Sequence, residues 1–137
     1  MSLKRYLLDS NAISDIVFRR HGVDDRALEH RRQGNHLGIC VPVLGEFIGG
    51  LEYSASREKN LLLAKRGLDS FRIWPYDAAA AWKYGELYAR LRRAGRTIQS
   101  VDLQIAAIAL TLGNCTVVTT DSDFAAVQEL PVVNWRI

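Results

Sequence analysis

The stretch YLLDSNAIS, residues 6–14, is the part of the sequence that decides the fold, because an apolar run ends there in a single acid, Asp9. Residues 4–8 are predicted to form a short buried strand, and residues 11–20 a helix capped by Ser10 or Asn11. A carboxylate at the end of a buried strand is costly unless something compensates for its charge. The sequence therefore raises the question of what Asp9 holds.

The rest of the chain continues this alternation of apolar strands with helices. Further strands are expected at residues 37–41, 71–76, 115–120 and 132–136, and helices between Gly22 and Gly34 and at 42–54, 56–70, 77–95 and 101–113, the last one capped by Ser100. Strands that are apolar throughout are typical of a parallel sheet covered on both faces. We therefore expect a single domain over residues 1–137, an α/β protein with a three-layer α/β/α sandwich and a central parallel sheet of four to five strands.

The composition fits one folded domain and gives a weak indication of its partner. The formal net charge of the 137-residue chain is +3, and most of its basic residues are arginine, which favours a phosphate-bearing partner only slightly. Cys40 and Cys115 lie in apolar segments without metal-binding spacing, so both are expected to be buried, reduced thiols. The N-terminus lacks the apolar stretch of a signal peptide, and a cytoplasmic protein is expected.

Four acids stand where a parallel sheet would bring them together. Asp9 and Asp121 each follow a predicted strand, and Glu46 and Asp102 lie near the starts of helices among apolar neighbours. Each has an ordinary structural explanation, since Asp9 and Asp121 fit helix caps, Asp102 fits the positive end of a helix, and Glu46 fits a solvent-facing position. Ligands of open parallel sheets nevertheless gather at the carboxyl ends of the strands, so the four acids are expected to share one pocket.

Clustered carboxylates repel one another and need a cation or bound protons. Oxygen ligands without nearby His or Cys favour Mg²⁺ or Mn²⁺ over zinc or copper. Such an ion can activate water and balance the charge on a phosphoryl group, so the residues point to hydrolysis of a phosphodiester.

The same residues carry a resemblance to a known family. LLDSNAIS, VPVLGEFIGGLEYS, RLRRAGRTIQSVDLQIAAIALTLGNCTVVTTDSDF and the closing LPVVNW together resemble the PIN-domain ribonucleases, specifically the VapC-type toxins of toxin–antitoxin pairs. The family often has Pro or Gly just before its third acid. This chain has IQSVD there instead, where Ser100 is expected to act as a plain N-cap.

The resemblance implies a metal-dependent endoribonuclease whose catalytic and metal-binding acids are Asp9, Glu46, Asp102 and Asp121. Asp123 is the alternative fourth acid, or a contact to the metal through water, and Ser10 and Asn11 would hydrogen-bond a ligand carboxylate or a metal-bound water. The implied cofactor is Mg²⁺ or Mn²⁺, and the implied substrate is RNA.

The resemblance also implies two protein partners. One is a second copy of the chain, in a homodimer. The other is a cognate VapB-type antitoxin whose C-terminal segment lies along the toxin and reaches the acidic pocket. Five apolar side chains near Glu46 fit a groove for that segment or, alternatively, the core: Phe47, Ile48, Leu51, Leu61 and Leu62.

The basic residues that best fit an RNA-binding role precede the helix of Asp102. Arg90, Arg92, Arg93 and Arg96 are expected to grip phosphates, or else to form a solvated helix face that complements the helix dipole. Trp82, Tyr84 and Tyr88 fit base stacking, although their helical spacing is more common in a core.

Two other functions compete with the nuclease. A catalytically inactive PIN-like module that binds RNA or protein would keep the fold, but it would have no need of four mutually repelling acids. A phosphatase using Asp9 as phosphoryl acceptor is disfavoured, because the expected D-x-D pattern has Asn11 at its second position.

Overall fold

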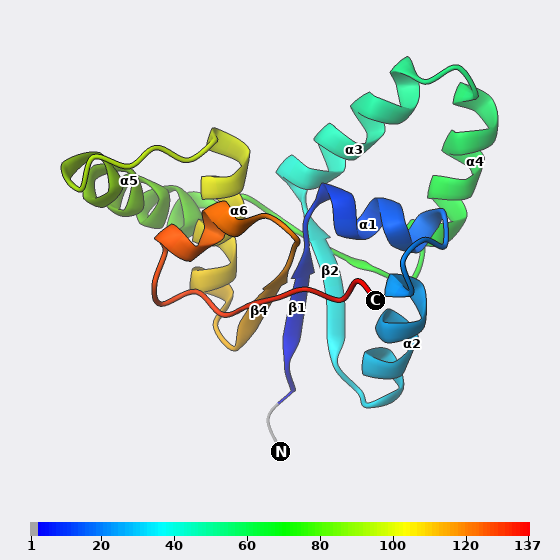
Figure 1. The fold of residues 1–137 in the computed structure, drawn as a ribbon, viewed down its shortest axis with the longest axis horizontal. Helices are drawn as coiled ribbons and strands as arrows, with labels where there is room; N and C mark the ends of the chain where they lie inside the picture. Colours follow the sequence, from blue (N-terminus) through cyan, green and yellow to red (C-terminus); the bar gives the residue numbers. More distant parts are fainter. Residues whose placement is uncertain (1–2) are drawn as a thin grey trace.

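The computed structural model describes residues 3–137 and contains, within them, a five-stranded parallel sheet flanked by six helices (Figure 1). The strands are β1 (Arg5–Leu8), β2 (His36–Cys40), β3 (Arg72–Trp74), β4 (Cys115–Val118) and β5 (Val132–Val133). The helices are α1 (Ser10–Val17), α2 (Val23–Arg32), α3 (Val41–Tyr53), α4 (Arg57–Leu68), α5 (Ala78–Arg93) and α6 (Ser100–Leu112), with a short 3-10 helix, η1 (Ser122–Ala126). The predicted α/β/α class with a parallel sheet is confirmed.

The strand order β3-β2-β1-β4-β5 places β1 at the centre of the sheet. Leu8, the last residue of β1, pairs with Val118, the last residue of β4. The chain therefore leaves both strands at the same edge of the sheet, at residues 9 and 119. Figure 1 shows α5 and α6 at one end of the molecule and α3 and α4 at the other, with β1 and β2 between them.

The strands are apolar because they are buried on both faces. Leu7, Leu8, Ile39 and Val117 have no exposed surface. At Gly38 in β2, an added Cβ would lie 2.6 Å from the carbonyl oxygen of Arg72 and 2.8 Å from the ring of Trp74. Glycine at this position therefore allows β2 and β3 to pair closely.

Two predicted helix caps are wrong. Helix α1 begins at Ser10 and is capped by Asp9, so neither Ser10 nor Asn11 is the cap. The cap of α6 is Gln99, which makes no side-chain capping bond, and Ser100 is already the first helical residue. The backbone enters each helix one residue earlier than the nearest Ser or Asn suggested.

Other sequence-based expectations agree with the structure. Asp77 caps α5 by accepting a hydrogen bond from the backbone N–H of Ala80 at 2.9 Å. Cys40 and Cys115 are buried free thiols, and burial raises their pKa values to about 11 and about 12. Among residues 3–137, no helix combines the length and apolar character needed to span a bilayer.

Candidate active site

The candidate site lies where the chain leaves β1 and β4. Asp9 follows β1 directly, and Thr119 and Asp121 follow β4, its neighbour in the sheet. Glu46 comes from the second turn of α3 and Asp102 from the first turn of α6. The parallel topology thus brings side chains from four separate segments to one edge.

Asp9 is fixed in place by hydrogen-bond donors on both of its carboxylate oxygens. It is only 7% exposed. Its Oδ1 accepts from the backbone N–H of Ala12 at 2.8 Å, and its Oδ2 accepts from the hydroxyl of Thr119. Both bonds come from neutral groups, so they orient the carboxylate without neutralising its charge.

Thr119 links two of the acids. Its hydroxyl donates to Asp9 and accepts from the backbone N–H of Asp121 at 3.0 Å. Asp121 in turn caps η1, because its Oδ1 accepts from the backbone N–H of Asp123 at 2.9 Å. Asp9 and Asp121 therefore both act as helix caps, as the sequence suggested, and both also face the shared site.

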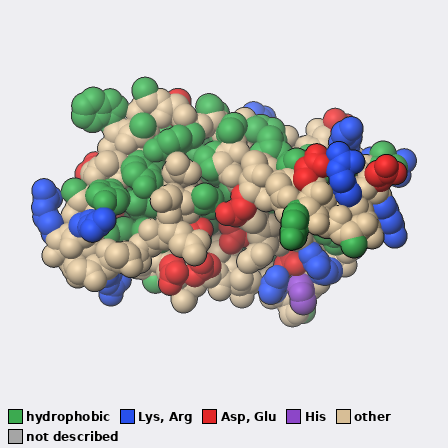
Figure 2. Space-filling model, turned by 90° about the horizontal axis from the view of Figure 1, so that it is seen from above, with side chains coloured by type: hydrophobic (Ala, Val, Ile, Leu, Met, Phe, Trp, Pro, Cys, Tyr) green, Lys and Arg blue, Asp and Glu red, His purple; other side chains and the backbone are tan. Residues whose placement is uncertain are grey.

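The acids enclose a small cavity of about 160 Å³. Its lining residues come from α1, α3, α6 and the two strand ends, and they are Asp9, Ser10, Asn11, Glu46, Gln99, Asp102, Ile105 and Asp121. All four predicted acids, and both predicted polar neighbours, thus border one cavity. Figure 2 shows this face from above, with acidic side chains near its middle and a broad hydrophobic area beside them.

Ser10 and Asp123 hold different positions around the cavity. The hydroxyl of Ser10 donates a hydrogen bond to the carboxylate of Glu46, which joins α1 to α3 across the site. Asp123 does not line the cavity, but carboxylate oxygens of Asp102, Asp121 and Asp123 lie within 4.8 Å of one another. Asp123 therefore stands beside Asp121 at the rim.

The electrostatics of the site follow from this crowding. Burial, followed by repulsion from Asp121, Asp9, Glu46 and Asp123, raises the pKa of Asp102 to about 6. Burial also raises the pKa of Asp9, although the bonds from Thr119 and Ala12 partly oppose that shift. The protein pays a free-energy penalty to keep these groups ionised and close together.

Within the described part of the chain, the cluster has no basic side chain in direct contact with it. Among residues 3–137, no ion pair involves Asp9, Glu46, Asp102 or Asp121. Arg136 lowers the pKa of Asp9 from a distance, but its guanidinium is bound to Asp15 at 2.8 Å. The residues that line the cavity offer carboxylate, hydroxyl and amide oxygens and no His or Cys, a donor set that fits a hard divalent cation.

The predicted RNA-binding arginines have different environments. Arg90 donates two hydrogen bonds to Glu129, at 3.1 and 2.8 Å, and this contact raises its pKa. Arg92 lies over the ring of Tyr88 at 5.1 Å, and Arg92 and Arg96 line a second cavity next to the N-terminus of α6. Arg93 is exposed. The four arginines therefore do not form one uniform patch.

The expected apolar groove near Glu46 is mostly core. Phe47 and Leu51 are buried, Ile48 and Leu61 are half-buried, and only Leu62 is largely exposed. The aromatic residues of α5 divide similarly. Tyr84 is half-buried, whereas Tyr88 is 44% and Trp82 83% exposed.

Sequence reasoning missed Thr119 and Gln99. Thr119 is buried and joins two strand ends, and its only sequence signal was a hydroxyl at the end of an apolar β-branched run. Gln99 lines the cavity from the residue before α6, where Ser100 was taken as the cap instead.

An open parallel α/β sheet with uncompensated carboxylates at its carboxyl edge is an arrangement that can hold a divalent cation, and proteins that hydrolyse phosphate esters use such sites. The PIN domain model matches residues 6–130. The chain therefore belongs to the PIN domain family, as its sequence motifs suggested.

Individual relatives place it with the VapC proteins of that family. It is 30% identical to the tRNA(fMet)-specific endonuclease VapC of Shigella flexneri, over 96% of this chain and 98% of the relative. It is 29% identical to the ribonuclease VapC2 of Rickettsia felis, over 95% and 97%. Among solved structures, VapBC2 from Rickettsia felis bound to a promoter DNA fragment superposes with a TM-score of 0.87, at 28% identity over 96% of this chain and 98% of that one.

Proposed function

We propose that this protein is a metal-dependent endoribonuclease that hydrolyses RNA phosphodiester bonds and acts as the toxin of a toxin–antitoxin pair. The observation that carries the proposal is the cavity bordered by Asp9, Glu46, Asp102 and Asp121, with no ion pair to any of them among residues 3–137. The ribonuclease and endonuclease names of the curated relatives support the same activity.

The four carboxylates are the proposed holders of Mg²⁺ or Mn²⁺. When bound, such an ion would lower the pKa of a water molecule and balance negative charge on the phosphoryl group. Thr119 and the N–H of Ala12 hold Asp9 in one orientation, and Ser10 does the same for Glu46. Fixed ligands of this kind cost no reorganisation at the moment of reaction.

The direct test is cleavage of RNA by the wild type, with and without a chelator. Because one relative is named as specific for tRNA(fMet), tRNA is the first substrate to assay, followed by mRNA and rRNA. We expect cleavage with Mg²⁺ or Mn²⁺, none with chelator, and none by Asp9→Asn. Asp69→Asn, which removes an exposed carboxylate at the end of α4, is the matched control and should cleave normally.

Cleavage that survives both the chelator and Asp9→Asn would contradict the proposal. An intact fold that binds RNA without cutting it would instead support the inactive binding module. A toxin that attacks cellular RNA would act in the cytoplasm, which is where we propose that this protein works.

A VapB-type antitoxin is the proposed partner, because the Rickettsia felis neighbour is a VapBC complex. Tyr53, at the end of the same helix as Glu46, is 95% exposed, and Leu62 on the neighbouring α4 is 51% exposed, so α3 and α4 offer apolar contacts to a partner. A cationic antitoxin side chain would find its counter-charge in the acidic cavity. Co-expression with a VapB-type protein that binds this chain should give a stable complex that no longer cleaves RNA.

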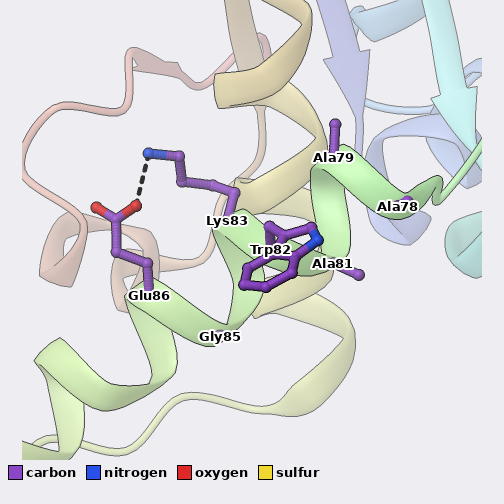
Figure 3. Close-up of a pocket in the computed structure, with 7 residues that line it drawn as sticks. All are labelled: Ala78, Ala79, Ala81, Trp82, Lys83, Gly85 and Glu86. Atoms are coloured by element: carbon purple, nitrogen blue, oxygen red, sulfur yellow. Dashed lines mark hydrogen bonds and ion pairs between the residues drawn. The ribbon is translucent and has the colours of Figure 1, made fainter.

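A second copy of the chain is the proposed partner of the outer face of α5. Figure 3 shows this face, where Trp82 lies beside Ala78 and Ala81, and Lys83 is paired with Glu86 at 3.0 Å. A tryptophan that is 83% exposed on a helix face of small residues is typical of an interface. Two antiparallel copies related by a two-fold axis would set Lys83 of each against Glu86 of the other.

The mass in solution tests this dimer. Light scattering should give a dimer for the wild type and a monomer for Trp82→Ala at the same concentration. Tyr53→Ala removes an equally exposed aromatic side chain from α3 and should leave the dimer intact. A monomeric wild type, or a dimer that Trp82→Ala does not weaken, would contradict this arrangement.

A further inference from the structure

A second cavity adjoins the acidic one at the N-terminus of α6. It has a volume of about 310 Å³ and lies between the last turns of α5, the segment 94–99 and the first turn of α6. Its lining includes Tyr88, Leu91, Arg92, Arg96, Ser100 and Leu103. Ser100 faces this cavity, whereas Gln99 and Asp102 face the acidic one, so the same helical turn separates the two.

One wall of the cavity is a supported aromatic ring. The ring of Tyr88 stacks on Tyr84 with centroids 6.2 Å apart and an interplanar angle of 18°. Tyr84 in turn meets the ring of Tyr76 edge-on at 6.4 Å. Tyr88 has the ring of Tyr84 on one side and the guanidinium of Arg92 over it, and it is still 44% exposed. Such a ring is a platform on which a flat group can stack at little cost in side-chain entropy.

The other wall is cationic and unpaired. Arg92 and Arg96 take part in no ion pair among residues 3–137, whereas Arg90, on the same helix as Arg92, is occupied by Glu129 and Glu86. The guanidinium of Arg92 lies 5.1 Å from the centre of the Tyr88 ring. A positive charge on a flexible side chain therefore lies over the aromatic ring, and it can move from the ring to a phosphate.

Helix α6 adds a second attraction for an anion. It has 13 residues, and its cap, Gln99, makes no side-chain bond to the first turn. The backbone N–H groups at the start of the helix therefore receive no hydrogen bond from the side chain of the cap residue. Their partial positive charge lies between the two cavities, where a phosphate that joins two nucleotides would pass.

We infer that this second cavity binds one nucleotide of the RNA substrate, next to the phosphodiester that is cut. The base stacks on Tyr88 in place of the Arg92 guanidinium, which moves to the adjoining phosphate and holds it together with Arg96. A nucleotide consists of a flat base and a negatively charged phosphate. Tyr88 matches the base, and the two arginines match the phosphate. This inference rests on the proposed ribonuclease function, and it narrows the predicted RNA-binding cluster to two of its four arginines.

Binding of RNA in a chelator tests the inference without any cleavage. The probe is a short fluorescein-labelled single-stranded RNA, and its anisotropy is followed at several salt concentrations. Arg92→Gln and Arg96→Gln should each weaken binding about tenfold and lower the salt slope by about one unit. Tyr88→Ala should weaken binding about tenfold with no change in salt slope, and Tyr88→Phe should bind as the wild type does.

Arg66→Gln is the control for net charge. It removes an exposed arginine from α4, at the opposite end of the molecule from α5 (Figure 1), and should change binding less than twofold. Circular dichroism of Tyr88→Ala checks that it folds, and Arg92→Gln and Arg96→Gln, at exposed positions, provide the test if it does not.

The outcomes separate this inference from the proposed function. If the wild type cleaves RNA and the Arg92, Arg96 and Tyr88 variants all bind it normally, the nucleotide site is wrong and the nuclease stands. If these variants lose binding of the antitoxin and retain binding of RNA, the cavity belongs to the antitoxin and the inference is overturned. If the wild type neither binds nor cleaves RNA, the proposed function itself fails.

Discussion

Two buried aspartates, Asp9 and Asp15, lie six residues apart at the two ends of α1 and have opposite surroundings. Asp9 is 7% exposed and Asp15 is 2% exposed. Asp15 is bound by the guanidinium of Arg136 at 2.8 Å and has Arg20 at 3.8 Å. Among the described residues, the donors to the carboxylate of Asp9 are the hydroxyl of Thr119 and the backbone N–H of Ala12.

The two carboxylates differ in whether the chain itself supplies a counter-charge. Asp15 has its counter-charges within the chain, and the pair with Arg136 ties the C-terminal segment to α1. Asp9 is oriented just as firmly, but its charge is left uncompensated, beside three more acids. A buried carboxylate that is positioned and not neutralised indicates a site built for something outside the chain.

The largest effect is expected for Asp9→Asn. We expect RNA cleavage to fall by at least about 1000-fold, because an ion-holding carboxylate supplies several kcal/mol in the transition state. In a chelator, the free energy of unfolding should not decrease, since the variant removes a buried uncompensated charge and keeps an oxygen for Ala12. Cleavage rates and urea titrations of the same preparations measure both. A clear loss of stability would show that Asp9 is structural, as Asp15 is.

The next largest effect concerns the other aspartate. Arg136→Gln removes the nearer of the two guanidinium groups that the structure places on the buried carboxylate of Asp15, so the free energy of unfolding should fall by more than it does for Asp15→Asn. Asp15→Asn should cost less, about 1–2 kcal/mol, because Arg136 is partly exposed and can turn to water. Urea titrations give both values. The expectation is wrong if the two variants lose the same unfolding free energy, or if Arg136→Gln loses less than the removal of an exposed ion pair would.

A smaller effect is expected at Thr119, which orients Asp9. Thr119→Val keeps the shape and removes the hydroxyl, and we expect the affinity for Mn²⁺ to fall about tenfold. Thr119→Ser keeps the hydroxyl and should restore most of that affinity. Calorimetric titration with Mn²⁺ is the measurement. If Thr119→Val binds Mn²⁺ as tightly as the wild type, the hydroxyl of Thr119 has no role in metal binding and the prediction is wrong.

The smallest effect is the pH dependence of the metal-free protein. The pKa of Asp102 is raised to about 6 in the fold from an ordinary value of 3.8. Folding therefore favours the protonated form of Asp102. The contribution of this proton to the free energy of unfolding is complete below pH 3.8 and disappears as the pH rises through 6. After allowance for solvent screening at this half-buried group, the loss should be about 1 kcal/mol.

The comparison with Asp102→Asn isolates this effect, because other acids titrate in the same range. The difference in unfolding free energy between variant and wild type, both in chelator, should grow in favour of the variant between pH 4 and pH 7. Adding Mn²⁺ at pH 7 should stabilise the wild type and not the variant. A difference that stays constant with pH would mean that Asp102 is not held among like charges.

Much of the site was accessible from the sequence. The apolar run ending at Leu8 correctly placed the end of β1, the strand predicted at 115–120 ends two residues earlier, at Val118, and the parallel pattern implied that the two ends meet at one edge. Asp9, Glu46, Asp102 and Asp121 were therefore expected at one cavity, and the structure brings them there. Helix caps were less predictable, because Ser10 and Ser100 are good caps locally while the backbone turns into each helix one residue earlier.

What the sequence by itself determined is the set of elements and the acids at their ends, because burial periodicity and turn residues act over a few positions. Only the tertiary structure decided the pairings: Thr119 with Asp9, Arg136 with Asp15, and Glu129 with Arg90. The partners in these pairs are separated by 39 to 121 residues. Their contacts depend on strand order and on where loops cross the sheet, and no local pattern encodes either. The sequence therefore identifies the charged residues, and the fold decides which of them have a counter-charge within the described chain.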